Sequence, residues 1–183
     1  MEHKILIAGF GGQGVMLMGQ LMGYSACEHG KSVTFFPSYG AEQRGGTANC
    51  SVVVSDEEVG APNPRILDTV VIMNEPSLAK FAGRVKRNGS LIVNGDLVRN
   101  VPDGLDANIY SIPVVSIARE IGNPKVANMV MAGAIIELTG ILPETVVAKV
   151  AEKKLGKSPE LVAMNNEALR KGMEYGKKLI NKV

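Results

Sequence analysis

The sequence predicts an α/β fold: a single-domain, three-layer sandwich with a largely parallel, Rossmann-like sheet and extra C-terminal helices. Three observations lead to this prediction. Short apolar runs alternate with helical patterns up to about residue 113, only helical patterns follow, and a Gly-x-Gly-x-x-Gly spacing comes directly after the first apolar run. The 183 residues, 45% of them hydrophobic, suit one domain over residues 1–183 with an aliphatic core.

Six segments have the character of strands. Most are short apolar runs, as expected for parallel strands buried on both faces, whereas the third run alternates apolar and polar residues. The expected strands are Lys4–Ala8, Ser32–Phe36, Thr47–Ser55, Thr69–Met73, Ser90–Val93 and Ala107–Ile112.

Helical patterns fill most of the remaining chain. The first helix is expected over Val15–Ala26 with Gly30 as its C-cap, and Asn74 is expected to cap a helix over Ser77–Lys86. The expected C-terminal helices are Ser116–Ile121, Asn123–Thr139, Pro143–Leu155 and a last one that begins at Ser158-Pro159-Glu160. The helix Asn123–Thr139 is apolar nearly all round, so it is expected in the domain core or at a subunit interface.

The first candidate site is the glycine-rich turn after the first strand. Gly9, Gly11 and Gly14 have the spacing of a phosphate-binding turn between a strand and a helix. Gly9 is expected to allow a tight bend, Gly11 to let the backbone approach an anion, and Gly14 to let helix and strand pack closely, whereas Gly12 and Gln13 add a flexible backbone and one neutral amide. The helix N-terminus offers free N–H groups. The same spacing also suits a tight turn without a ligand, and the motif alone does not separate these interpretations.

The second candidate site is the segment Pro37–Gly46, which leaves the second strand at the edge where open α/β sheets bind ligands. A NAD-binding fold places an Asp or Glu at the end of this strand, and none stands there. The residues without a packing role are Ser38, Tyr39, Glu42 and Arg44, and the glycines that permit unusual backbone angles are Gly40, Gly45 and Gly46. Arg44 could clamp a carboxylate or phosphate with two hydrogen bonds. A surface loop with an internal Glu42–Arg44 pair remains the alternative.

The residues give little support to other chemistry. Cys27 and Cys50 are far apart and belong to no Cys-x-x-Cys motif, which argues against a zinc site or an iron–sulfur cluster held by this chain alone. His3 and His29 are poorly placed for catalysis, and Asp96 is expected to be a turn residue. No catalytic residue is therefore assigned.

Charge and hydropathy exclude further classes. The net charge of +2 is too small to imply a nucleic-acid partner. No apolar run approaches the roughly 20 residues of a membrane span. The first strand begins so close to Met1 that no signal peptide is expected, which favours a cytoplasmic location.

Together, the turn Gly9–Gly14 and the segment Ser38–Gly46 resemble the gamma subunit of 2-oxoacid:ferredoxin oxidoreductases, a family that includes enzymes for pyruvate, 2-oxoisovalerate and 2-oxoglutarate. The resemblance covers nearly the whole chain and continues through Ser55-Asp56-Glu57-Glu58 and the strand that ends at Asn74. The glycine motif is weak support, whereas the Tyr-Gly-x-Glu-x-Arg-Gly-Gly segment is far more specific.

This resemblance implies an assembly with alpha, beta and delta (ferredoxin-like) subunits. Members of the family decarboxylate a 2-oxoacid on thiamine diphosphate, pass electrons through iron–sulfur clusters to ferredoxin, and form an acyl-CoA. The resemblance implies that partner subunits hold thiamine diphosphate, Mg and the clusters, and that this chain alone binds none of them. Gly9–Gly14 would contact CoA or a subunit, and the segment Ser38–Gly46 would form an interface or anion contact.

Two other functions remain open at this point. A stand-alone dinucleotide-binding oxidoreductase would use the glycine turn, although the missing acidic residue counts against it. A subunit of indolepyruvate:ferredoxin oxidoreductase would share the chemistry with different partners and substrate. Overall similarity slightly favours 2-oxoglutarate or a branched-chain 2-oxoacid over pyruvate. A homodimer of the isolated chain is a further expectation, because the apolar helix Lys125–Thr139 would otherwise meet water.

Overall fold

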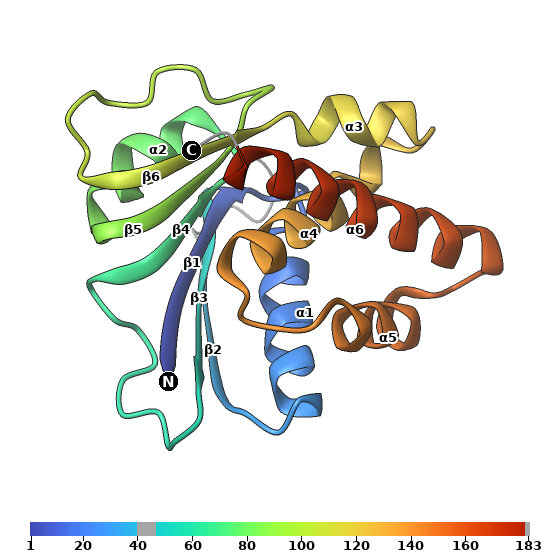
Figure 1. The fold of residues 1–183 in the computed structure, drawn as a ribbon, viewed down its shortest axis with the longest axis horizontal. Coiled ribbons are helices and arrows are strands. Elements are labelled where there is room, and N and C mark those ends of the chain that lie inside the picture. Colours follow the sequence, from blue (N-terminus) through green and yellow to red (C-terminus); the bar gives the residue numbers. More distant parts are fainter. Residues whose placement is uncertain (40–46, 182–183) are drawn as a thin grey trace.

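The computed structural model describes residues 1–39 and 47–181, which form an α/β fold around a six-stranded sheet (Figure 1). The strand order is β2-β3-β1-β4-β5-β6. The strands are β1 (Glu2–Phe10), β2 (Ser32–Tyr39), β3 (Thr47–Ser55), β4 (Leu67–Ile72), β5 (Val85–Asn94) and β6 (Ala107–Ile112). Strands β1, β4, β5 and β6 are parallel to one another, and β3 is antiparallel to both β1 and β2. The sheet is therefore largely parallel, as the sequence predicts.

The antiparallel β3 separates β1 from β2, which distinguishes this sheet from the usual dinucleotide-binding order. Only residues 40–46 connect β2 to β3, fewer than the roughly dozen residues that a parallel crossover needs. The chain therefore returns beside β2 in the opposite direction. As a result, β2 is an edge strand and the carboxyl ends of β1 and β2 lie two strands apart.

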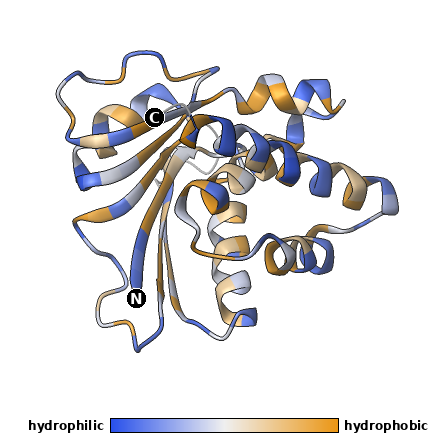
Figure 2. Cartoon of the chain, in the orientation of Figure 1, coloured by the Kyte–Doolittle hydropathy of each residue, from blue (hydrophilic) through white to orange (hydrophobic). Residues whose placement is uncertain are grey.

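Helices cover both faces of the sheet and complete the three predicted layers (Figure 1). One face carries α2 (Glu75–Phe81) and the short η1 (Ala82–Arg84). The other face carries α1 (Val15–Glu28), α3 (Val114–Glu120), η2 (Pro124–Val126), α4 (Ala127–Thr139), α5 (Glu144–Leu155) and α6 (Pro159–Ile180). Figure 2 shows hydrophilic residues spread along α6, which packs along α4.

The alternation of side chains along β1 serves two hydrophobic cores. Ile5 and Ile7 point into the larger core beneath α1 and α4, and Leu6 and Ala8 point into the smaller core, which Leu78 of α2 helps to close. All four of these strand residues are buried. An apolar strand buried on both faces is typical of a parallel sheet covered by helices on either side.

Helix α4 lies in the core of the domain. Every residue from Ala127 to Ile136 is buried, and α6 packs along this helix. Of the two places that the sequence leaves open for this helix, the structure selects the domain core. The sequence predicts a homodimer because this helix would otherwise meet water. That reason no longer applies, because α6 of the same chain covers the apolar surface of α4.

The predicted element boundaries are mostly right, with one clear error. The segment expected to be helical up to Lys86 is helical only to Phe81, a 3₁₀ turn follows, and β5 already starts at Val85. Pairing of β5 with β4 and β6 extends the strand beyond its apolar residues. Asn74 caps α2 by accepting a hydrogen bond from the Ser77 N–H, as predicted, whereas the C-cap of α1 is His29, and Gly30 follows it with a φ of 74°.

Candidate functional site

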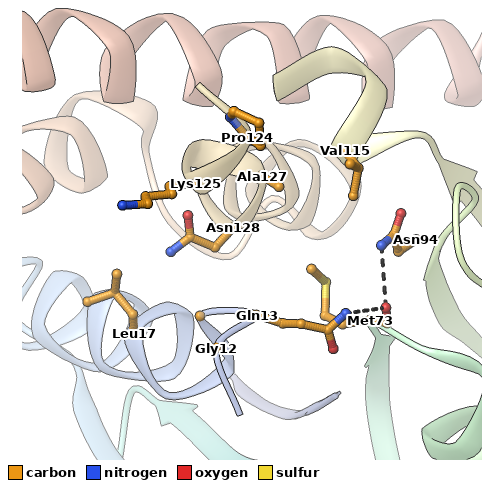
Figure 3. A pocket seen from close by; sticks show the side chains of 11 residues that line it. Gly12, Gln13, Leu17, Met73, Asn94, Val115, Pro124, Lys125, Ala127 and Asn128 are labelled. Atoms are coloured by element: carbon orange, nitrogen blue, oxygen red, sulfur yellow. Dashed lines mark hydrogen bonds between the residues drawn. The ribbon is translucent and has the colours of Figure 1, made fainter. Parts of the chain in front are cut away.

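A cavity of about 360 Å³ lies at the carboxyl edge of the sheet, where β1, β4 and β5 end (Figure 3). The glycine turn forms one wall, and α3, η2 and the start of α4 form the opposite wall. Its lining residues are Gly12, Gln13, Gly14, Leu17, Met73, Asn94, Val115, Pro124, Lys125, Ala127 and Asn128. Open α/β sheets bind their ligands at this edge, so the cavity is the candidate site.

The glycine turn presents an uncapped helix N-terminus to this cavity. The Gln13 N–H donates to the Phe10 carbonyl at 3.2 Å, which closes a tight turn whose third residue, Gly12, has a φ of 98°. Gly14 is the N-cap of α1 with a φ of 75°, no side chain of the described residues caps this helix, and its first turn contains no acidic residue. The first N–H groups of α1 and the positive end of its dipole are therefore available to an anion.

Lys125 and Asn128 face the turn from the other wall. Lys125 lines the cavity and makes no ion pair with a carboxylate of the described residues. Asn128 is only 7% exposed, and its Oδ1 accepts a hydrogen bond from the Met129 N–H at 2.9 Å. Its Nδ2 lies beside Gly14 at the lining of the cavity. A lysine, an amide and free backbone N–H groups make this site suitable for a phosphate or carboxylate.

A second cavity of about 610 Å³ adjoins the first and shares Leu17, Lys125 and Asn128 with it. It runs between α1, α4 and the connection from α5 to α6. Its lining adds Lys154 and Lys157 and contains no carboxylate, while its other residues are apolar side chains and asparagines. The two cavities together suit a long ligand with negative charge and an apolar part.

The structure corrects the roles expected for two of the glycines. Gly9 lies inside β1 rather than at a bend, and a Cβ there would come within 2.7 Å of Gln13 Oε1 and 2.8 Å of Met73 Cβ. Gly14 makes room for another helix rather than for a strand, since a Cβ there would lie 2.6 Å from Asn128 Nδ2 on α4. Gly11 lies in the turn, and Gly12 is the residue that the bend itself requires.

The structure brings the start of the second predicted segment to the same edge as the glycine turn. Ser38 and Tyr39 belong to β2, whereas Gly40, Glu42, Arg44, Gly45 and Gly46 lie outside the described residues. Both Tyr39 and Gly9 are paired with Ala48 of β3. The two motifs are therefore level with each other and two strands, about 10 Å, apart.

Several lining residues have no signal in the sequence motifs. Met73 and Asn94 follow two apolar strands, which is the only cue to their position, and Lys125 and Asn128 lie within a helical pattern far along the chain. Asp96, expected in a turn, accepts hydrogen bonds from the Val115 and Ser116 N–H groups and so fixes the start of α3. Burial alone would raise the pKa of Asp96, but the hydrogen bonds from Ser116 and Val115 outweigh it and hold that pKa below its usual value.

Residues 1–39 and 47–181 contain no metal-binding cluster, and the buried Cys50 thiol is unreactive. This part of the chain contains no cluster of three His, Cys, Asp or Glu that could hold a metal ion. Burial raises the pKa of the Cys50 thiol to about 12, so this side chain is inert and its S–H faces the Val15 carbonyl at 3.6 Å. The lysine, the amide and the backbone N–H groups of the site are therefore its features of interest, and they suit the binding of an anion.

Fold and cavity thus define a class: an α/β domain with a glycine turn and a helix N-terminus beside a cavity at the carboxyl edge of a largely parallel sheet. The model of the family Pyruvate ferredoxin/flavodoxin oxidoreductase matches residues 4–175, and the chain belongs to this family. Within residues 1–39 and 47–181, no helix is long and apolar enough to cross a membrane.

Three relatives illustrate how the domain occurs. The 2-oxoglutarate synthase subunit KorC of Methanocaldococcus jannaschii is 36% identical over 183 residues, which cover 98% of this chain and 96% of KorC. The ketoisovalerate oxidoreductase subunit VorA of Methanothermobacter marburgensis is 35% identical over 179 residues. That match covers 97% of this chain but 37% of VorA, so the chain spans little more than a third of that relative. The indolepyruvate oxidoreductase subunit IorB of Pyrococcus horikoshii is more distant, at 25% identity.

Solved structures agree with this assignment. The gamma subunit of a keto/oxoacid ferredoxin oxidoreductase from Geobacter sulfurreducens superposes with a TM-score of 0.87 at 28% identity, and the match covers 98% of both chains. A 2-oxoglutarate:ferredoxin oxidoreductase from Magnetococcus marinus, solved with 2-oxoglutarate, coenzyme A and succinyl-CoA bound, has the same TM-score and identity. In that case the match covers 97% of this chain and 31% of the other. The predicted fold class and family resemblance are confirmed.

Proposed function

We propose that the chain is the gamma subunit of a multi-subunit 2-oxoacid:ferredoxin oxidoreductase and supports the oxidative decarboxylation of a 2-oxoacid to an acyl-CoA, with electrons passed to ferredoxin. The observation that carries this proposal is the family match over residues 4–175, together with the end-to-end similarity to KorC. Its partners are then alpha, beta and ferredoxin-like delta subunits. Use of CoA and ferredoxin by this proposed complex supports the cytoplasmic location expected for the chain.

We assign thiamine diphosphate, Mg and the iron–sulfur clusters to the partner subunits. The described part of this chain offers no set of three side chains that could ligate a metal ion. We therefore derive no step of their chemistry for this chain. The contribution left to it is binding and positioning at the edge of the sheet.

The cavity beside the glycine turn is our candidate for part of the CoA site. CoA supplies the thiol that takes up the acyl group, and it carries phosphates at the far end of a long molecule. The free N–H groups at the start of α1 and the ammonium of Lys125 suit such phosphates. The second cavity past Leu17, with Lys154 and Lys157, offers room for an extended ligand. The Magnetococcus marinus relative was solved with coenzyme A bound, which supports CoA over a dinucleotide.

The segment Ser38–Gly46 is proposed to contact the partner subunits or an anion. It starts level with Gly9 at the carboxyl edge, and this position supports a role next to the cavity. Glu42 and Arg44 carry the charges that such a contact would use. Both lie outside the described residues, so this part of the proposal rests on the motif.

Replacing Lys125 tests the CoA site in the assembled enzyme. Lys125→Ala is expected to raise the KM for CoA about tenfold with little change in kcat, because a charge-assisted hydrogen bond to a phosphate is lost. Steady-state kinetics of the holoenzyme with a viologen dye as electron acceptor would measure both constants. The matched control is Lys153→Ala on the exposed side of α5, which should leave the KM unchanged. An unaltered KM in Lys125→Ala would contradict the proposed CoA site.

The subunit assignment is tested by purifying a tagged chain from cells that contain its native partners. Co-purification of alpha, beta and ferredoxin-like chains with thiamine- and CoA-dependent dye reduction is expected, and the active oxoacid would identify the substrate. A chain recovered alone that binds NAD(P)H in a titration would support the dinucleotide-binding alternative and overturn the assignment.

A further inference from the structure

The side chain of Gln13 is folded back onto the protein instead of reaching across the cavity that it lines. Its Oε1 accepts hydrogen bonds from the Phe10 N–H at 2.7 Å and from Asn74 Nδ2 at 3.1 Å. Its Nε2 donates to the Met73 carbonyl at 3.1 Å, and Figure 3 shows this bond beside the one from Asn94. Two acceptor sites and one of the two donors of the amide are therefore used within the chain.

These contacts tie the glycine turn to the ends of two other strands. Met73 follows β4, and its carbonyl also accepts a hydrogen bond from Asn94 Nδ2 at the end of β5, at 3.3 Å. Asn74 caps α2 with its other amide atom, since its Oδ1 accepts from the Ser77 N–H at 3.0 Å. Asn74 and Asn94 are almost fully buried, at 3% and 0% exposure. A buried and connected polar network of this kind rigidifies the segments that it joins.

Two further features show that the turn is built around this amide. A Cβ on Gly9 would lie 2.7 Å from Gln13 Oε1, so the glycine leaves the space in which the amide lies. The turn is closed twice between the same two residues, by the Gln13 N–H to the Phe10 carbonyl and by the Phe10 N–H to Gln13 Oε1. Between these two residues, Gly12 has a φ of 98° and open space around its Cα. Packing therefore does not fix its conformation, and the two hydrogen bonds that close the turn do.

We propose that Gln13 is a positioning residue that fixes the direction of the N–H groups of Gly12, Gly14 and the start of α1, so that they converge on an anion without contact between Gln13 and that anion. The proposal rests on the CoA site proposed above. A glycine-rich turn alone is conformationally free, and binding would have to offset the entropy lost when a ligand orders it. The amide of Gln13 sets this conformation before the ligand arrives.

The test uses two isosteric variants of the assembled enzyme. Gln13→Met removes all three hydrogen bonds without adding charge, and Gln13→Glu keeps both acceptor contacts but puts an oxygen against the Met73 carbonyl. We expect both variants to raise the KM for CoA about tenfold, with kcat within about twofold, which corresponds to the loss of one or two net hydrogen bonds. Gln20→Glu, on the exposed side of α1, adds the same charge and should leave the KM unchanged.

Acidification adds a readout that a general loss of stability would not produce. Once protonated, the carboxyl group that Gln13→Glu introduces can again donate to the Met73 carbonyl. The ratio of the KM of Gln13→Glu to that of the wild type should therefore fall as the pH is lowered, because the facing Met73 carbonyl favours the protonated carboxyl. Lys125 is the only titratable side chain of the described residues that lines this cavity. Gln13→Met should show no such recovery.

The outcomes separate this inference from the function on which it rests. A raised KM in Lys125→Ala with an unchanged KM in Gln13→Met would keep the CoA site and overturn the positioning role. A raised KM in Gln13→Glu alone would reduce the effect to added charge and would also overturn it. An unchanged KM in Lys125→Ala and in both Gln13 variants would overturn both proposals.

Discussion

At the scale of single residues, the candidate site depends on glycines whose roles differ. Gly12 needs its positive φ but has free space around it, so only backbone strain opposes a side chain there. Gly14 combines a φ of 75° with close contact to Asn128 Nδ2 of α4. Gly9 has no positive φ and is required by the space that Gln13 and Met73 occupy. One motif therefore contains a strained position, a packed position and one that is both.

Alanine substitutions should separate these roles. Gly12→Ala should lower the free energy of unfolding by about 1–2 kcal/mol, the cost of a left-handed residue with a side chain. Gly14→Ala should cost more, about 3 kcal/mol in total, because its Cβ would also displace Asn128. Urea unfolding of the isolated chain measures both, with Gly60→Ala in an exposed loop as a neutral control. Equal losses at positions 12 and 14 would contradict the contact with Asn128.

At the scale of elements, the crossing of α4 and α6 holds the outer helical layer on the domain. Gly133 and Gly172 let the two backbones approach, since a Cβ on Gly133 would lie 2.0 Å from the Leu169 carbonyl oxygen, and a Cβ on Gly172 would lie 1.9 Å from that of Val130. The start of α4 carries Asn128 and adjoins Lys125, so this crossing also determines where the second wall of the cavity stands. The stability of the site is thus linked to contacts on the far side of α4.

A methyl group between α4 and α6 should lower the free energy of unfolding, although alanine favours a helix over glycine. Gly172→Ala should lower the free energy of unfolding by about 3 kcal/mol, because two backbones must separate. Gly176→Ala, one turn later on α6, would meet the Cβ and Cγ of Glu137 at 3.3 Å rather than a backbone atom, so its helix-propensity gain of about 1 kcal/mol should offset the milder crowding. Chemical denaturation of both variants measures the difference, and similar stabilities would show that the helices do not cross as closely as described.

At the scale of the whole molecule, several ionisable groups have lowered pKa values in the folded state and therefore make the fold less stable as the pH falls. Burial lowers the pKa of His3, which lies near the amino end of β1 with its Nε2 2.9 Å from Thr69 Oγ1. Burial alone would raise the pKa of Asp68, but hydrogen bonds from Lys86 and from the Lys4 N–H outweigh it and leave that pKa lowered. Lys31 and the N-terminal ammonium lower the pKa of Asp56 to about 2. In each case the folded state binds protons less readily than the unfolded state.

Acidification should therefore destabilise the protein in two phases. The contribution of His3 is fully present above pH 6.5 and is lost as the pH falls toward its lowered folded pKa. That of the carboxylates is lost only below about pH 4, the usual range of their unfolded pKa values. Urea unfolding between about pH 8 and pH 3 would show both phases, and His3→Gln should remove the first. His29→Gln, at the exposed end of α1, should retain it; a first phase that survives in His3→Gln would contradict this assignment.

Local signals and long-range packing account for different parts of this description. Apolar runs, caps and glycines are local signals, so the order of the elements, the largely parallel sheet and the family could be predicted from them. The start of β5 at Val85 could not be predicted from local signals, because pairing with β4 and β6 makes this segment a strand rather than the end of a helix. The glycine turn was also predictable, but the roles of Gly9 and Gly14 were not, since they depend on Met73 and Asn128, residues distant in sequence.

The chemistry available at the start of α1 follows from the amino-acid sequence alone, because glycines and a free helix N-terminus are local properties of the chain. The residues that face this turn do not follow from it. Lys125 and Asn128 lie more than a hundred positions further along the chain, and they reach the turn through the packing of α4 between the sheet and α6. Long-range packing therefore decided which side chains complete the candidate site.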